Sequence, residues 1–243
     1  MCSLIVLRGL DRAYPLFVAA NRDERTDRPS SSPRSWRGQR RQLLSPRDER
    51  AGGTWLAVDR AGRVAAVTNV AGAPAVPGAP SRGHLPHLAL DHDDLEAGVE
   101  AVLRHVEETP HAGFQLLVAA ADRAWVVRYV DGVAACEEPT ASTLALTNEH
   151  ALGAWSPRGL AGALAPDLGR DARLERLAEC LRDRGGDGHH AVCKHGDSYG
   201  TVSSSLIALS RLGRGPSIWR YAAGPPDVTA YRSYEVSPAR RDG

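Results

Sequence analysis

The residue in this sequence that is best suited to act as a catalytic group is the cysteine at position 2. Removal of Met1, which we expect because the next side chain is small, leaves a thiol and a free α-amine on Cys2. The thiolate is the nucleophile in cysteine chemistry, and an α-amine, with a pKa of about 7.7–8.0, can accept a proton at neutral pH. One residue would then supply nucleophile and base. The alternative is that Cys2 is a small buried hydrophobe at the start of a strand.

Asparagines that could support such a nucleophile stand at the ends of three predicted strands. They are Asn21, Asn69 and Asn148. An asparagine side-chain NH₂ is a good oxyanion donor, and removing one from such a site typically costs about 2.7–4 kcal/mol. The alternative is that each asparagine is a turn residue, which is common where a strand ends.

Charged residues follow Asn21 directly, in the run Asn21-Arg22-Asp23-Glu24. Arg22 near Cys2 would favour the thiolate, and Asp23 or Glu24 could hold the α-amine or Arg22 in place. The alternative is a solvated turn with salt bridges. Together with Cys2, these residues make Cys2, Asn21, Arg22, Asp23, Asn69 and Asn148 the predicted catalytic set.

The nine histidines suggest a competing interpretation as metal or haem ligands. His189 and His190 with His195 could bind a metal or haem, but the sequence has no H-E-x-x-H and no His/Cys set at zinc spacing. We therefore predict surface histidines, no metal site and no cofactor. The remaining cysteines, Cys136, Cys180 and Cys193, form no C-x-x-C pair and are expected to be free thiols.

Composition excludes several classes of function. The 243 residues are 42% hydrophobic and 24% charged with a net charge of +1, so no global field indicates nucleic acid or an acidic membrane. No apolar run approaches the ~18–20 residues of a membrane span, and the N-terminus does not resemble a signal peptide. We expect a cytoplasmic protein that binds neither nucleic acid nor membrane; whether it forms a homo-oligomer stays open.

Alternating apolar patterns predict the elements that must position these residues. Strand pairs are expected at 2–20, 52–70 and 114–130, and a helix at 171–182. A helical region is expected at 87–108, broken in the middle by the acidic run 91–94. Further strands are expected at 142–148, 199–209, 217–222 and 229–236, and a short helix at 191–194. Segments 30–50 and 71–86 are predicted to be loops that flank a pocket. The result is an α+β fold with segregated layers, in one domain over 1–243.

Several of these motifs together resemble the NRDE family, which is the family of the transport and Golgi organisation protein 2. The matching pieces run in order from residue 1 to about 209: Met1-Cys2, Asn21-Arg22-Asp23-Glu24 with Arg28-Pro29, Gly52-Gly53-Thr54-Trp55-Leu56, Thr68-Asn69, Leu146-Thr147-Asn148 and Tyr199-Gly200-Thr201. The tetrapeptide with its Arg-Pro and the Gly-Gly-Thr-Trp-Leu block are specific in combination.

The resemblance implies an N-terminal-nucleophile (Ntn) hydrolase-like fold, an αββα sandwich of two antiparallel sheets between helical layers. It also implies a more distant similarity to choloylglycine hydrolases and penicillin acyltransferases. Those enzymes use an N-terminal cysteine, an arginine and an aspartate near the end of the second strand, and two asparagines. By that resemblance Asn69 and Asn148 take the asparagine positions, while the arginine and aspartate fall within Asn21 to Glu24, with the register open by one residue.

One position departs from the family pattern. After Tyr199-Gly200-Thr201 the family usually has an arginine, and this chain has Val202. If that arginine orients a substrate carboxylate or supports the thiolate, the substrate or the activity of this chain would differ.

Three functional interpretations remain. In the first, Cys2 is the nucleophile of an amidohydrolase or acyltransferase that cleaves the C–N bond of a small-molecule amide, and Asn69 and Asn148 bind the oxyanion. In the second, which the family's link to haem trafficking suggests, the chain binds or transfers haem without catalysis. In the third, it is a structural protein with an unused pocket. The first requires removal of Met1.

Overall fold

The apolar run at the start of the chain forms strand β1 (Ser3–Arg8), which pairs with β2 (Leu16–Arg25) on one side and β10 (Thr143–Thr147) on the other. The sheet continues through β11 (Tyr199–Leu209), β12 (Ser217–Ala222) and β13 (Arg232–Val236), in the order β10-β1-β2-β11-β12-β13. All its pairings are antiparallel. This six-stranded sheet, the first sheet, brings Cys2, the end of β2 and the start of β11 to one end of adjacent strands.

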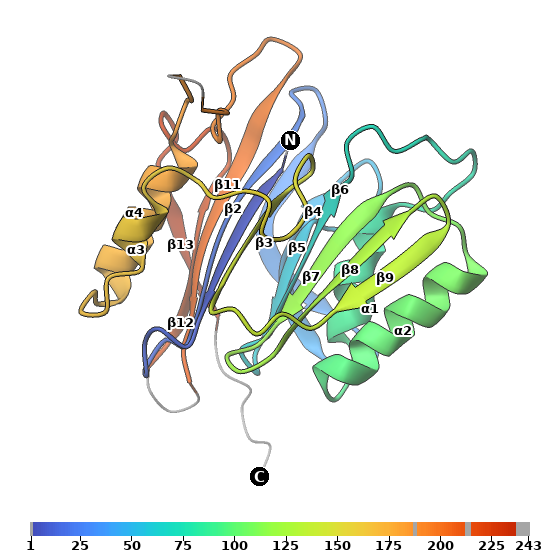
Figure 1. Cartoon of the computed structure of the whole chain (residues 1–243), viewed down its shortest axis with the longest axis horizontal. Coiled ribbons are helices and arrows are strands. Elements are labelled where there is room, and N and C mark those ends of the chain that lie inside the picture. Colours follow the sequence, from blue (N-terminus) through green and yellow to red (C-terminus); the bar gives the residue numbers. More distant parts are fainter. Residues whose placement is uncertain (1, 187–188, 212–214, 237–243) are drawn as a thin grey trace. The chain divides into compact units, whose positions relative to one another are not determined.

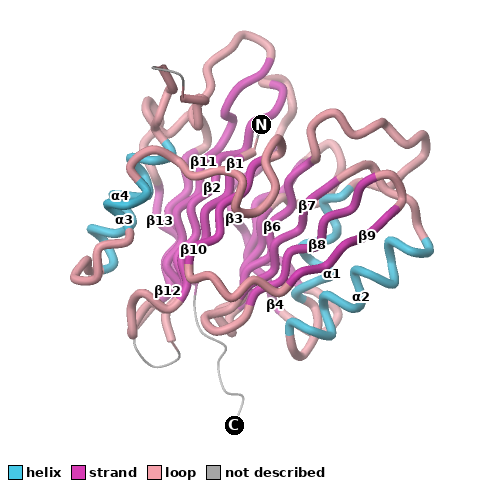
Figure 2. Tube along the Cα trace, in the orientation of Figure 1, coloured by secondary structure: helices cyan, strands magenta, loops and turns pink. Residues whose placement is uncertain are grey.

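The structure is a computed structural model that describes residues 2–186, 189–211 and 215–236. The chain divides into two units, one made of residues 1–28 with 142–243 and the other of residues 29–141 (Figures 1 and 2). The first sheet belongs to the first unit. Met1, whose removal the sequence predicts, lies outside the described residues.

Two helices belong to the first unit, α3 (Leu160–Ala163) and α4 (Arg170–Leu181). The apolar side of α4, with Leu174, Leu177 and Leu181, packs against Phe17 of β2 and Leu206 of β11 in one buried cluster. Alternate residues of a strand share a face. The face of β2 that carries Phe17 therefore meets the helices, and Asn21 belongs to that same face.

The second unit is built on a seven-stranded antiparallel sheet, the second sheet, whose strands follow one another in sequence order from β3 to β9. These are β3 (Ser30–Arg37), β4 (Gln42–Asp48), β5 (Leu56–Asp59), β6 (Val64–Asn69), β7 (Phe114–Ala119), β8 (Ala124–Val130) and β9 (Val133–Glu137). Such a meander needs only short connections between most strands. The exception is the stretch between β6 and β7, which holds the helices.

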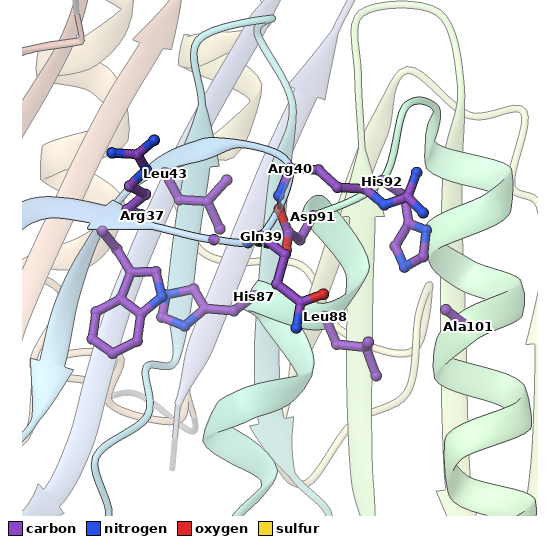
Figure 3. Close-up of a pocket in the computed structure, with 11 residues that line it drawn as sticks. Arg37, Gln39, Arg40, Leu43, His87, Leu88, Asp91, His92 and Ala101 are labelled. Carbon is purple, nitrogen blue, oxygen red and sulfur yellow. Dashed lines mark hydrogen bonds between the residues drawn. The ribbon is translucent and has the colours of Figure 1, made fainter.

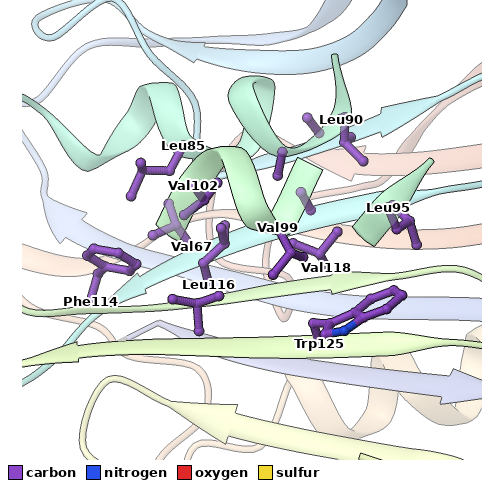
Figure 4. Packing of buried hydrophobic residues seen from close by; sticks show 14 of the residues in the cluster. Val67, Leu85, Leu90, Leu95, Val99, Val102, Phe114, Leu116, Val118 and Trp125 are labelled. Atoms are coloured by element: carbon purple, nitrogen blue, oxygen red, sulfur yellow. The ribbon is translucent and has the colours of Figure 1, made fainter. Parts of the chain in front are cut away.

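Those helices are the short 3₁₀ helix η1 (Arg82–His84), α1 (Leu85–Leu90) and α2 (Leu95–Glu108). The acidic run 91–94 separates α1 from α2, as predicted, and the Asp94 side chain caps α2 by accepting from the Ala97 N–H at 2.8 Å. The apolar sides of both helices pack on β6, β7 and β8 (Figure 4), where Val99 and Val102 of α2 meet Leu116 and Val118 of β7. This cluster is the core of the second unit.

The structure corrects the expectation that 30–50 is a loop, since it contains β3 and β4. The strand β3 is the edge of the second sheet and is mostly polar, with Pro33 inside a shift of register between Ser31 and Arg34. Polar side chains, a proline and a bulge are typical of edge strands, and they hide the apolar alternation on which the prediction relied. The predicted loop 71–86 is a loop only over 71–81, because residues 82–86 belong to η1 and α1.

Smaller differences concern short elements. Residues 191–194 form bends rather than the predicted helix, and β9 and α3 were not predicted. Of the residues that the structure describes, no helix is long and apolar enough to cross a membrane.

Candidate functional site

Cys2 immediately precedes β1, at the end of the first sheet where its strands β1 and β11 begin and β2 and β10 end. Its side chain is half-buried, and its thiol lies 3.8 Å from the backbone carbonyl oxygen of Asp23, to which it donates. The carbonyl oxygen of Cys2 accepts a 3.2 Å hydrogen bond from the Asn148 N–H, which extends the pairing of Ser3 with Thr147 by one residue. Backbone contacts on both sides thus fix the position of Cys2.

Asp23 connects Cys2 to the start of β11. Its carbonyl oxygen accepts a 3.0 Å hydrogen bond from the Tyr199 hydroxyl as well as the thiol contact. Its carboxylate accepts a 2.7 Å hydrogen bond from the buried Thr201 hydroxyl, which itself accepts from the Lys194 N–H at 2.9 Å. Asp23 therefore positions the thiol through its main-chain carbonyl, and the Thr201 hydroxyl fixes its carboxylate nearby.

The environment of Cys2 raises the pKa of its thiol. Burial is the larger cause and the Asp23 carboxylate the next, while Arg22 acts in the opposite direction more weakly. Burial also raises the pKa of Asp23, against the hydrogen bond from Thr201. Arg22 thus favours the thiolate, as expected, but burial and Asp23 outweigh it. The thiol is protonated at neutral pH, and its reaction needs a base.

The four residues of the run at the end of β2 have separate surroundings. The Asn21 side-chain NH₂ donates to the carbonyl oxygens of Leu181 and Val192, at 2.9 and 3.0 Å, on the face of the sheet that meets the helices. Arg22 is buried, points to the opposite face by strand alternation, and forms an ion pair with Glu24 at 3.8 Å. Asn21 therefore joins β2 to the end of α4, whereas Asp23 contacts Cys2.

The other two predicted asparagines lie in different units. Asn148 follows β10, opposite Cys2, and its Oδ1 is buried without a hydrogen-bond partner among the described residues. Asn69 is the exposed last residue of β6 in the second unit, opposite Phe114 of β7. A direct contact with Cys2 through the backbone is thus seen for Asn148, and the role of Asn69 stays a prediction.

Sequence reasoning did not assign roles to Tyr199 and Thr201, although both stand in a matched motif. Proximity to Cys2 and burial raise the pKa of Tyr199, burial being the larger cause. The feature of the sequence that could have indicated their role is the pair of hydroxyl residues at the start of the strand. The unusual Val202 lies where the pairing of β11 with β2 shifts register, between Thr201 and Ser203, so a bulge separates Thr201 from the regular part of the strand.

The predicted histidine group at 189–195 is not formed as a unit. His195 instead pairs with Asp227 at 2.9 Å, and the Cys193 thiol donates to the same carboxylate at 3.2 Å. The ring of His190 lies 5.9 Å from that of His150. Two groups of potential metal ligands occur among the described residues, Cys193 with His195 and Asp227, and His84 with His105 and His111. The sequence predicted neither.

A pocket of about 600 Å³ lies in the second unit (Figure 3). It is lined by residues of the β3–β4 hairpin and of the α1–α2 region, among them Trp36, Arg40, His87 and Asp91. None of the predicted catalytic residues lines this pocket, so the prediction that 30–50 and 71–86 flank the pocket of the catalytic site stays a prediction. Burial lowers the pKa of His87 to about 4, so its imidazole is neutral there; its Nε2 lies 2.9 Å from the Ser45 hydroxyl.

Comparison with solved structures shows the class of fold. Two structures of variants of the conjugated bile acid hydrolase from Clostridium perfringens superpose on 98% and 99% of this chain, with TM-scores of 0.50 and 0.52 and 12% sequence identity. They are covered over 98% and 99% of their own length. Two antiparallel sheets with few helices and this similarity define an Ntn-hydrolase fold, as the sequence predicted.

The family follows from sequence comparison. The family model Transport and Golgi organisation 2 matches residues 1–159, and the chain belongs to this family. Homologues from Mus musculus and Bos taurus are 37% and 35% identical over 114 and 126 residues, which are 44% and 48% of this chain. The alignments span only 39% and 44% of those relatives.

Proposed function

We propose that the chain is a cysteine Ntn amidohydrolase or acyltransferase that cleaves the C–N bond of a small-molecule amide through an acyl-enzyme on Cys2. The observation that carries the proposal is the constellation at one end of the first sheet. There the Cys2 thiol contacts the Asp23 carbonyl oxygen, and Asn148 bonds to the Cys2 backbone. The similarity to structures of a hydrolase supports the same reading.

The raised pKa of Cys2 defines what the reaction needs first. A protonated thiol must give its proton to a base before sulfur attacks, and the α-amine of Cys2, once Met1 is removed, has a suitable pKa of about 7.7–8.0. The neighbouring Asp23 carboxylate, held by Thr201, would stabilise the ammonium group that forms. A negative charge beside the thiol is then an advantage, because it favours the state in which the amine is protonated.

The remaining steps follow acyl-transfer chemistry. The thiolate sulfur bonds to the amide carbon, and the carbonyl oxygen becomes an oxyanion that the Asn148 side-chain NH₂ would bind. The C–N bond breaks as the ammonium returns its proton to the departing amine. Water or a second amine then attacks the thioester, releases the acyl group as acid or new amide, and restores the thiol. Asn69 has the second donor role only by family resemblance.

The test is trapping of the acyl-enzyme by intact mass. Because Cys136 is an exposed thiol, the parent protein for this experiment carries Cys136→Ala. A small p-nitrophenyl ester should then add one acyl group to a protein that lacks Met1, and the adduct should decay in water. The double variant Cys2→Ala/Cys136→Ala should add none.

Two results would overturn the proposal: a purified protein that retains Met1, or acylation that persists without Cys2. Cys180 and Cys193 are poor nucleophiles at neutral pH, because burial raises the pKa of Cys180 to about 11 and that of Cys193 to about 12. The haem-binding interpretation remains a prediction from the resemblance, and a haem titration of the same proteins examines it.

A further inference from the structure

Three histidines meet in the second unit where its helical segment begins and ends. His84 is the last residue of η1, His105 lies in the last turn of α2, and His111 lies in the connection from α2 to β7. Each offers one ring nitrogen, and these nitrogens lie within 4.8 Å of one another. The ring centroids form a near-equilateral triangle with sides of 4.8, 5.3 and 5.2 Å.

Backbone contacts orient two of the rings in the way that metal-binding imidazoles are oriented. His84 Nδ1 donates to the Ser81 carbonyl oxygen at 2.5 Å, and His111 Nδ1 donates to the Thr109 carbonyl oxygen at 2.8 Å. A carbonyl oxygen can only accept, so Nδ1 carries the proton in both rings and Nε2 keeps its lone pair. Such a contact on the other ring nitrogen fixes the tautomer of a metal ligand.

The Nε2 atom of His111 provides a second, independent observation. The residue is 2% exposed, and its Nε2 is buried with no hydrogen-bond partner in the part of the chain that the structure describes. A buried acceptor without a partner destabilises the folded chain, and a cation bound to its lone pair would remove that cost. Edge-to-face contacts with Phe114 and Tyr129 explain the packing of the ring but give Nε2 no hydrogen-bond partner.

We propose that His84, His105 and His111 form a binding site for a divalent transition metal ion of the Zn²⁺ class. Three imidazole nitrogens suit zinc, copper or nickel rather than magnesium or calcium, which prefer oxygen ligands. The site lies in the second unit and does not depend on the function proposed for Cys2. It is distinct from the group around Cys193.

The geometry is close to that of a bound ion. In a tetrahedral site with metal–nitrogen bonds of about 2.0–2.1 Å, neighbouring nitrogens are about 3.3 Å apart. The Nε2 atoms of His84 and His105 are 2.9 Å apart, so they need to separate by a few tenths of an ångström. His105, which donates its Nε2 proton to His84, must move that proton to Nδ1 or release it.

The surroundings indicate what completes the coordination. His84 and His105 are only partly buried, so water can reach the fourth position. The Arg82 guanidinium donates to the Gly113 carbonyl oxygen at 2.9 Å, and its positive charge contributes to lowering the pKa of His111. The same charge opposes a bare cation at the site and favours an anionic fourth ligand such as hydroxide or a carboxylate. A bound ion would join η1, the end of α2 and the segment entering β7.

The experiment is a metal titration of the tag-free full chain after treatment with a chelator. Zn²⁺ is titrated against a chromophoric competitor, and Co²⁺ serves as a probe whose visible bands report tetrahedral nitrogen ligation. We expect one ion per chain, a higher melting temperature with metal, and at least a ~10–100-fold loss of affinity in His84→Ala and in His105→Gln. Circular dichroism checks that each variant folds; the partly buried positions are chosen for that reason.

Two matched controls locate the site. His92→Ala removes a histidine near the same helices and should leave one ion bound with unchanged affinity. Cys193→Ser removes a ligand of the other group and should also change nothing. Absence of stoichiometric binding to the parent chain, unchanged affinity in both His84→Ala and His105→Gln, or loss of the ion in Cys193→Ser would each overturn the proposal.

Discussion

The Cys2 thiol lies 3.8 Å from the main-chain carbonyl oxygen of Asp23, and the carboxylate of the same aspartate raises the pKa of that thiol. Asp23 thus positions the sulfur and adds to the effect of burial, which is the larger cause of the raised pKa. In a reaction that begins with proton transfer from the thiol to an α-amine, the starting enzyme needs a sulfur that is in position and still carries its proton. Asp23 should therefore control the ionisation of Cys2 more strongly than the adjacent Arg22.

Replacing Asp23 with asparagine should lower the pKa of Cys2. Burial would still raise it, but the second cause, the negative charge, would be gone, while asparagine retains an oxygen for the Thr201 hydroxyl. The pH midpoint of iodoacetamide alkylation, followed by intact mass in the Cys136→Ala background, should shift to lower pH. Asp27→Asn, at an exposed ion pair with Arg25, is the control and should not shift it. An unchanged or higher midpoint in Asp23→Asn would contradict this account.

The Thr201 hydroxyl is a second point of control, because it is buried and has two partners. It donates to the Asp23 carboxylate and accepts from the Lys194 N–H. Thr201→Val keeps the shape and leaves both partners unsatisfied, so we expect a loss of about 1–3 kcal/mol in the free energy of unfolding. Urea denaturation measures it, with the exposed Thr140→Val expected within about 0.5 kcal/mol of the parent. Equal stabilities for the two variants would show that this hydrogen-bond chain contributes nothing.

The sequence predicted that these residues form a cluster, but it did not predict which contacts each residue makes. The run from Asn21 to Glu24 was correctly placed near the end of the second strand. Strand alternation separates Arg22 from Asn21, which bonds to Leu181 and Val192 on the helix-facing side. Asp23 is paired directly with Thr201, next to the register shift between Thr201 and Ser203. Such a shift has no signature in the pattern of residue types, so the sequence could not place Asp23 opposite Thr201.

The histidine group shows a different limit. His84, His105 and His111 belong to separate elements, and their convergence depends on how η1 and α2 pack on the second sheet. No spacing motif brings together side chains whose proximity is set by tertiary packing. The apolar periodicity of 87–108 did predict a helical region broken at the acidic run, although α1 begins two residues earlier, at Leu85.

The close approach of α1 and α2 gives a prediction about that packing. An ideal Cβ on Gly98 would lie 1.9 Å from the Ala89 carbonyl oxygen, a backbone atom that cannot move alone. Gly98→Ala should therefore separate the helices and cost roughly 1–3 kcal/mol or more, as overpacking does. Gly162→Ala in α3 is the matched control: its nearest contact would be 3.7 Å, and the helix propensity of alanine should make it neutral or slightly stabilising. Thermal unfolding of the two variants, with shifts of opposite sign, measures the difference.

Replacing the two asparagines of the first unit should have different effects, one on stability and the other on the rate of reaction. Asn21→Ala removes two buried hydrogen bonds to Leu181 and Val192, so it should lower the free energy of unfolding by about 1–3 kcal/mol and leave the acylation of Cys2 in the folded protein unchanged. Asn148→Ala removes a proposed oxyanion donor. It should reduce turnover of an amide substrate by about 10²–10³-fold with little change in stability.

Urea denaturation and acylation kinetics on the same preparations separate these expectations. The backbone N–H of Asn148 still bonds to the Cys2 carbonyl oxygen in the alanine variant, so the position of the nucleophile is preserved and a loss of rate reports the side chain. If Asn21→Ala slowed acylation without destabilising the chain, Asn21 rather than Asn148 would face the substrate. If neither variant changed the rate, the oxyanion would be bound by other donors, and the part of the mechanism assigned to Asn148 would fail.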